Sequence, residues 1–220
     1  MMCCVKRALP RWPDMVLIAP PPPVVLPQPV FARVQSGVSL VRMYDPTRFN
    51  AQPTAFRFTG PYKRFDHQRE VNGKPALTTD RGIMYAGDTF SGCIVEVFGD
   101  RKIIEVGTWE VAVIEPTREL KLMDLRGAGA MKAGTVAAVC KDSNHKFSQE
   151  WSRYFYETTF AYQTIDGLLF QNAHNEETAY AFYERCASDF TVVRSGKLSN
   201  PALSNEIKLI AAAFNMDIAI

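Results

Sequence analysis

Short runs in which apolar and polar residues alternate recur along the chain after residue 30, and this period is typical of β-strands. We expect strands over residues 31–34, 38–44, 83–86, 109–114, 119–125 and 168–170. In the fifth of these, Leu120 and Leu122 share one face, while Lys121 and Met123 share the other. Residues 178–183 fit a strand or a helix by period alone, and their aromatic content favours a strand.

Three other segments repeat their apolar residues with the period of a helix. The first runs from Thr89 to Phe98, with Asp88 as its expected N-cap. The second covers residues 147–158, whose aromatic residues stack on one side, and the third begins at Asn200 and Pro201. Because strands and helices are mixed without strict alternation, the sequence predicts an α+β fold in a single domain.

Two stretches show neither period. Residues 1–30 carry most of the proline and predict an extended arm, either a disordered or surface-wrapping tail or a strap that docks on a partner or a second subunit. Residues 45–69 are rich in Pro, Gly, Arg and Phe. A long irregular stretch inside a compact domain is more often functional than accidental, so we expect part of a site there.

Composition narrows the class of protein. Of the 220 residues, 47% are hydrophobic and 22% charged, with a net charge of +2, which is ordinary for a soluble globular domain and does not predict nucleic-acid binding. The apolar run 15–19 stops at a proline stretch and is far shorter than the roughly 20 residues of a membrane span. Five cysteines, an odd number without a CxxC motif, favour the reducing cytoplasm, and no His or Cys spacing predicts a metal site.

Cations and phenols lie beside apolar residues of strand type, where an unpaired charge is costly. Arg42 ends the run Leu40-Val41-Arg42, and its planar fork suits a diphosphate; a salt bridge to a neighbouring strand is the alternative. Arg64 follows Gly60-Pro61 and could wrap phosphate oxygens. Asp66 would orient Arg64 or a ribose hydroxyl, or else cap backbone amides of its own turn.

Tyr85 and Glu96 complete the candidates that the residues themselves suggest. Tyr85 ends a short strand, where a phenol could stack on a flat ring, although a core tyrosine is the plainer interpretation. Glu96 lies in the apolar run 93–98, and we expect it to be buried. A fixed carboxylate stabilises the oxocarbenium-like state of glycosidic bond cleavage. The alternative is a surface position on an amphipathic helix.

These motifs, in this order, resemble the RES domain family, which is named for an Arg, a Glu and a Ser. The resemblance covers roughly residues 31–190. It rests on Leu40-Val41-Arg42, Arg64-Phe65, Met84-Tyr85-Ala86, Glu96 and the run that begins at Asp166-Gly167. In that run, Asn172 stands where the family has its serine, which is the one substantial departure.

The resemblance implies a fold similar to that of NAD-dependent ADP-ribosyltransferases, with mixed and antiparallel sheets flanked by helices. It implies a RES-like catalytic domain over residues 31–198, after the arm (1–30) and before a C-terminal helix and tail (199–220). Family members consume NAD+ as substrate, by hydrolysis, phosphorolysis or transfer of ADP-ribose, and many are toxins paired with an Xre-like helix-turn-helix antitoxin.

In that scheme Arg42, Glu96 and Asn172 are catalytic, and Arg42, Arg64, Tyr85 and Asp66 bind the dinucleotide. Asparagine, like serine, both donates and accepts hydrogen bonds, so contact with the substrate can survive the exchange, whereas its extra bulk can block the cleft. A catalytically silent module that binds a nucleotide or a protein therefore stays open as an alternative, as does a homodimer.

Overall fold

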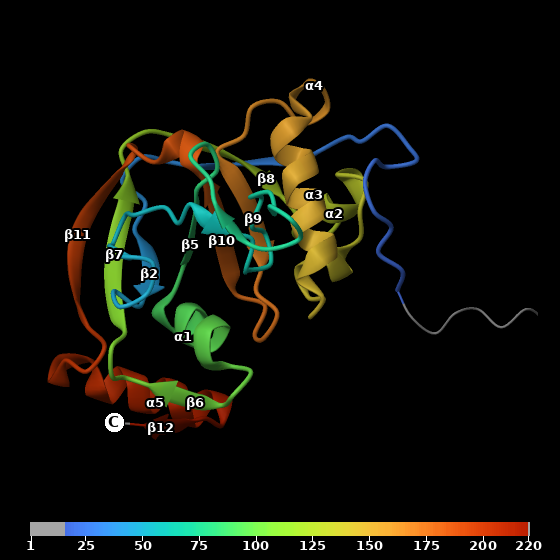
Figure 1. Cartoon of the computed structure of the whole chain (residues 1–220). Helices are drawn as coiled ribbons and strands as arrows, with labels where there is room; N and C mark the ends of the chain where they lie inside the picture. Colours follow the sequence, from blue (N-terminus) through green and yellow to red (C-terminus); the bar gives the residue numbers. More distant parts are fainter. Residues whose placement is uncertain (1–15, 220) are drawn as a thin grey trace, which may run out of the picture.

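One curled sheet of eight strands forms the centre of the molecule (Figure 1). The computed structural model describes residues 16–219. In spatial order the strands are β1 (Phe31–Val34), β8 (Leu120–Asp124), β9 (Gly167–Gln171), β10 (Thr178–Tyr183), β5 (Ile83–Gly87), β2 (Leu40–Tyr44), β7 (Glu110–Pro116) and β11 (Phe190–Lys197). Neighbours are antiparallel except for β8 and β9, which are parallel. The mixed sheet with its few helices confirms the predicted α+β fold.

Helices cover the sheet from two sides. Helix α3 (His145–Glu157), with α2 (Gly129–Lys132) and α4 (Thr159–Tyr162), packs beside β9 and β10, and its Trp151 and Phe155 are almost fully buried. On the other side, α5 (Ser204–Phe214) lies against α1 (Phe90–Phe98) and the small parallel pair β6 (Ile103–Glu105) and β12 (Asp217–Ala219) (Figure 1). The apolar residues that recur with helical spacing in the sequence are therefore the residues that fill these cores.

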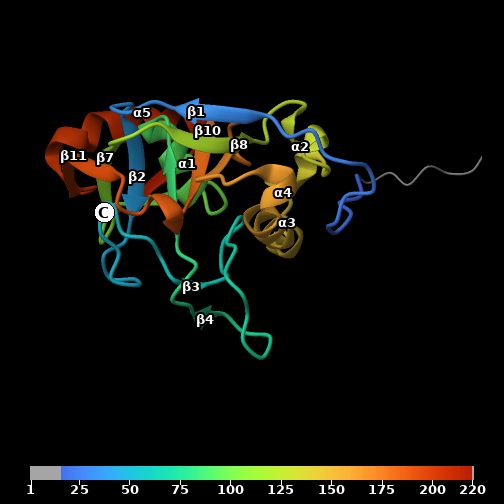
Figure 2. The same ribbon diagram turned by 90° about the horizontal axis from the view of Figure 1, so that it is seen from above.

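Short elements complete the chain. Single 3-10 turns lie at Ala137–Cys140, Glu184–Cys186 and Pro201–Leu203. Strands β3 (Thr59–Gly60) and β4 (Ala76–Leu77) pair within a long excursion that projects from the body in Figure 2. None of the helices within residues 16–219 is long and apolar enough to cross a bilayer.

The start of helix α1 differs from the expectation in one respect. Thr89, not Asp88, is the N-cap, because its hydroxyl accepts a hydrogen bond from the backbone N–H of Gly92 at 2.9 Å. The carboxylate of Asp88 is instead engaged by the hydroxyl of Tyr180. Both side chains can cap a helix, and the competing partner on β10 decides which of them does so.

The described part of the arm, residues 16–30, forms no helix or strand and lies along the body. Ile18 is 6% exposed, and the carbonyl of Ala19 accepts a hydrogen bond from the Trp151 indole at 2.8 Å. Farther on, the N–H of Gln28 donates to the carbonyl of Lys132 at 2.8 Å. These contacts agree with a surface-wrapping tail; the expectation for residues 1–15 lies outside the described residues.

The sheet divides between β2 and β5, and this division makes room for a site. The two strands share a single paired position, Val41 with Gly87. Beyond it, residues 42–44 pair with β7, whereas residues 83–86 pair with β10. The two halves of the sheet therefore separate from a common point, and helix α1 lies next to that point, where the Cys93 thiol contacts the Val41 carbonyl at 3.1 Å.

Candidate functional site

A cleft of about 880 Å³ occupies the space between the separated halves of the sheet. Its size is typical of pockets that hold small-molecule ligands. Seven Arg or Lys side chains line it, against three Asp or Glu: Arg42, Arg48, Arg57, Lys63, Arg64, Arg101 and Lys141, with Asp45, Glu96 and Asp100. The whole chain carries only +2, so its positive charge is concentrated here, where a polyanionic ligand would be favoured.

Arg42 enters the cleft from β2 and is 7% exposed. Within residues 16–219 its Nη1 atom is buried without a hydrogen-bond partner. Its guanidinium carbon lies 5.9 Å from the centre of the Tyr44 ring. Burial lowers the pKa of Arg42 to about 10, which still leaves it charged at neutral pH. Among the described residues Arg42 makes no salt bridge to a neighbouring strand, and it lines the cleft with this nitrogen unpaired.

Tyr85 and Asp66 form a hydrogen bond behind the surface of the cleft. The Tyr85 hydroxyl donates to Asp66 Oδ1 at 2.9 Å and accepts from the backbone N–H of Phe65 at 3.0 Å. Burial raises the pKa of the Tyr85 phenol well above its ordinary value. Tyr85 lines the cleft with the rest of its side chain. Its hydroxyl is thus already used, and the ring is the part that can face a ligand.

Asp66 is fully buried and does not line the cleft. Its carboxylate accepts hydrogen bonds from Arg57 Nη2, at 2.8 and 2.6 Å, and from the backbone N–H groups of Tyr62 and Lys63, at 2.6 and 2.8 Å. The interpretation in which Asp66 caps backbone amides of its own turn therefore describes this geometry. The carboxylate pairs with Arg57, not with Arg64, and it supports the cleft from below.

Arg64 lines the cleft near Glu96. Its Nη1 donates to the carbonyl of Asp142, and its Nε is buried with no partner in the described part of the chain. The charge of Arg64 is the largest influence that lowers the pKa of Glu96. The guanidinium and the carboxylate, which come from separate parts of the sequence, are therefore brought into electrostatic contact.

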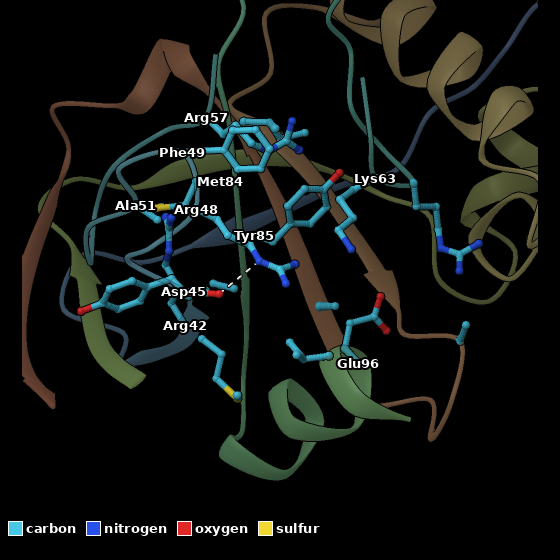
Figure 3. A pocket seen from close by; sticks show the side chains of 18 of the residues that line it. Arg42, Asp45, Arg48, Phe49, Ala51, Arg57, Lys63, Met84, Tyr85 and Glu96 are labelled. Carbon is cyan, nitrogen blue, oxygen red and sulfur yellow. Dashed lines mark ion pairs between the residues drawn. The ribbon is translucent and has the colours of Figure 1, made fainter. Parts of the chain in front are cut away.

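Glu96 projects from helix α1 into the cleft, with Lys63 above it in Figure 3. The side chain is exposed, so the expectation of a buried acid is wrong: the residues that α1 buries are on its other faces, such as Val95 and Phe98. Partial enclosure by the cleft wall still raises the pKa of Glu96, against the opposing effects of Arg64, His174 and the N–H of Ala173. Glu96 is thus a solvent-accessible acid on the wall of a cationic cleft.

Asn172 lies next to the cleft but does not line it, and it is 1% exposed. Its Oδ1 accepts hydrogen bonds from the backbone N–H groups of His174, at 3.1 Å, and Asn175, at 2.9 Å. These bonds fix the turn that carries Ala173 and His174, two residues that lower the pKa of Glu96. The side chain thus shapes a turn with its oxygen, while its Nδ2 is buried without a hydrogen-bond partner among the described residues, and direct contact with a ligand stays a prediction.

The structure also brings in residues that sequence reasoning did not select. Arg48 and Arg57 lie in the irregular segment 45–69, and Arg48 pairs with Asp45 at 3.2 Å (Figure 3). Lys63, Arg101, Lys141 and His145 belong to the same group. A signal was present, because Arg48 and Arg57, like Arg64, are each followed by a phenylalanine in the same segment.

The chain is similar to known proteins in both sequence and fold. The RES domain profile matches residues 39–201, whereas no curated protein matches the chain. A chain of the M. tuberculosis MbcT–MbcA toxin–antitoxin complex shares its fold, with a TM-score of 0.51 and 13% identity over 80% of this chain and 92% of that chain. At this identity the likeness concerns the fold alone. Because the profile spans most of the sequence, the chain belongs to the RES domain family.

Proposed function

We propose that this protein cleaves the bond between nicotinamide and ribose in NAD+. The observation that carries the proposal is the position of Glu96, a carboxylate facing into a cleft beside Arg64 and Lys63. Membership of the RES family supports it, since members of that family consume NAD+. A cationic cleft suits the diphosphate of the dinucleotide, and a fixed carboxylate suits the cationic transition state.

Binding follows from the charges and rings of the cleft. Arg42 and Arg64 would hold the diphosphate, because each has a buried guanidinium nitrogen without a partner among the described residues. The ring of Tyr85 would pack on the nicotinamide or its ribose. Asp66 and Asn172 would act as positioning residues, the first through Arg57 and Tyr85, the second through the turn beside Glu96.

In the reaction, the bond between ribose C1′ and the nicotinamide nitrogen breaks, and its electron pair leaves with nicotinamide, which becomes neutral. The positive charge that develops on the ribose is stabilised by the Glu96 carboxylate, which must be ionised for this purpose. A nucleophile then bonds to C1′ and loses a proton. Water, phosphate or a protein side chain would give ADP-ribose, its phosphate ester or a modified protein.

The test is nicotinamide release from NAD+ by purified protein, with and without phosphate or protein acceptors. Glu96→Gln should remove most of the release while leaving the fold intact, because the side chain is exposed. Folded protein that releases nothing under any acceptor condition would exclude the enzyme. If that protein still binds ADP-ribose by calorimetry, the silent nucleotide-binding module replaces it.

We further propose that the protein is the toxin of a toxin–antitoxin pair in the cytoplasm, with an Xre-like helix-turn-helix antitoxin that covers the cleft. The support is the shared fold with a chain of the MbcT–MbcA toxin–antitoxin complex. Expression in a bacterial host should deplete NAD+ and arrest growth, and co-expression of the adjacent gene should restore both. Depletion that no neighbouring gene relieves would indicate a solitary enzyme.

A further inference from the structure

Two aromatic rings are exposed at one end of the cleft. Phe49 is 56% exposed and lines the cleft, and Tyr62 beside it is 45% exposed. Their ring centres are 5.4 Å apart and the planes are tilted by 37°. Large apolar rings left open at the edge of a concave site are typical of binding surfaces. Neither ring has a role in the proposed cleavage step.

The backbone holds Phe49 in an unfavourable conformation. Its φ angle is +54°, and that of the next residue, Asn50, is +50°. A bulky residue in the left-handed region is uncommon and costs free energy, and such residues cluster at ligand sites. The fold thus keeps a phenylalanine exposed at this place at a cost that core packing does not explain.

A fixed cation accompanies the rings. The guanidinium carbon of Arg57 lies 5.7 Å from the centre of the Phe49 ring and 5.4 Å from that of Tyr62. Arg57 cannot swing away freely, because buried Asp66 binds its Nη2 at 2.6 Å. Two rings and a planar guanidinium therefore form a preordered surface of the kind on which nucleobases stack.

The position of this surface matches one end of a dinucleotide. In Figure 3, Phe49 and Arg57 lie at the end of the cleft opposite Glu96, with Tyr85 between them. NAD+ carries a second flat ring, adenine, on the far side of its diphosphate. We propose that Phe49, supported by Arg57 and Tyr62, is the platform on which the adenine base stacks. This inference rests on the proposed function, because it assumes that the dinucleotide has its nicotinamide ribose at Glu96.

The charges of the cleft favour a nucleotide over an apolar protein segment on this surface. Arg48 and Arg57 line the same end as Phe49, and both suit phosphate oxygens next to a stacked base. A hydrophobic peptide would cover these cations without offering them an anion beyond their present partners, Asp45 and Asp66. The platform would therefore set the preference for a dinucleotide over a mononucleotide.

The experiment compares NAD+ with nicotinamide mononucleotide, which has the same scissile bond but lacks adenosine. Phe49→Ala should lower kcat/KM for NAD+ about tenfold, the effect usual for removal of a stacking ring. It should leave kcat/KM for the mononucleotide within about twofold. Phe49→Trp should retain the preference for NAD+. Phe160→Ala is the matched control, because Phe160 is 89% exposed on α4 and does not line the cleft.

Calorimetry with ADP-ribose separates this inference from the proposed function. If the protein cleaves nothing but Phe49→Ala weakens ADP-ribose binding about tenfold, the enzyme fails and the adenine platform stands. An equal loss for both substrates, or no loss for either, would overturn the platform. Unchanged NAD+ kinetics in Phe49→Ala together with weakened antitoxin binding would also overturn it, because Phe49 would then contact a protein.

Discussion

The hydroxyl of Tyr85 donates a hydrogen bond to Asp66 Oδ1 at 2.9 Å, so a strand at the centre of the sheet is tied to the loop that carries the cationic residues. The same carboxylate binds Arg57 and the backbone at residues 62–63. Asp66 is fully buried, and among the described residues these groups are the donors to its carboxylate. One carboxylate therefore orders Tyr85, Arg57 and the loop backbone together.

Asp66→Asn tests this role. The amide keeps the shape but loses the charge opposite Arg57, and its NH2 group faces donors instead of accepting from them. Removal of one partner from a buried ion pair typically costs about 3 kcal/mol, and we expect a loss of that order in the free energy of unfolding. Urea denaturation followed by circular dichroism measures it.

Asp80→Asn is the matched control for that variant. Its side chain is 74% exposed, and it lies 3.8 Å from the Arg81 guanidinium in the same part of the chain. Because exposed ion pairs contribute about 0–1 kcal/mol, the control should unfold almost like the parent protein. Equal stability of both variants would show that Asp66 does not support the loop.

Arg42→Met should make the protein more stable and less able to bind. The buried Nη1 of Arg42 has no partner within the described residues, and its pKa is lowered to about 10 because burial disfavours the charge. A methionine, which is unbranched and apolar, removes that desolvation cost, so the free energy of unfolding should rise by about 1 kcal/mol. ADP-ribose affinity should fall at least tenfold, as measured by calorimetry. A destabilised variant would mean that Arg42 supports the fold instead of the ligand.

Much of the fold could be predicted because it depends on local apolar spacing. Helix α3 follows from Trp151 and Phe155, which are one turn apart and both buried. Strand β11 was missed, because it lies at the sheet edge and most of its residues are exposed, so no apolar alternation marks it. Edge strands are specified by their single neighbour, here β7, and not by their own pattern.

The cleft itself could be predicted only in part. Arg42 and Glu96 were selected from their apolar neighbours, and both line it. Arg57 was not selected from the sequence. Its position in the cleft depends on the separation of β2 from β5, which involves residues far apart in the sequence. Asp66 and Asn172 were expected to touch the ligand. A local pattern cannot tell a polar group that faces a ligand from one that faces backbone N–H groups.

Glu96 should give the reaction an acid limit above the usual range of a glutamate. Its pKa is raised by enclosure in the cleft wall, and only the ionised form stabilises the developing cation. The value of kcat/KM should therefore fall as the pH decreases through this raised pKa. A pH profile of nicotinamide release measures it, and a profile that is flat down to the ordinary range of a carboxyl group would contradict the role.

The raised pKa of Glu96 also predicts how Glu96→Gln affects stability. Ionisation of this acid is required for the reaction but is unfavourable for the fold. Because the folded state raises the pKa of this acid, its ionised form destabilises the fold, and this effect is present at neutral pH and disappears below the unfolded pKa. Glu96→Gln should thus be at least as stable as the parent protein at neutral pH, and the two should converge in acid. Glu206→Gln, at an exposed position on α5, is the control for both measurements.

Asn172→Ala tests whether the position of the family's serine acts through the turn or through the substrate. The substitution removes the acceptor for the N–H groups of His174 and Asn175, so the turn that carries Ala173 and His174, which both lower the pKa of Glu96, is no longer fixed. A displaced turn should raise the pKa of Glu96 further and move the acid limit to higher pH. We expect kcat to fall about tenfold with KM within about twofold, since loss of hydrogen bonds of this kind costs about 1–2 kcal/mol.

Three further variants make this test of Asn172 specific. Asn172→Asp keeps an acceptor oxygen for the turn and should restore most of the rate, although its negative charge would itself raise the pKa of Glu96. Asn200→Ala removes a similar cap, which accepts from the N–H of Ala202 at 3.0 Å far from the cleft, and should leave the kinetics unchanged. If Asn172→Ala instead raises KM while kcat and the pH profile stay constant, the asparagine contacts the substrate. A large gain of activity in Asn172→Ser would mean that the asparagine had silenced the site.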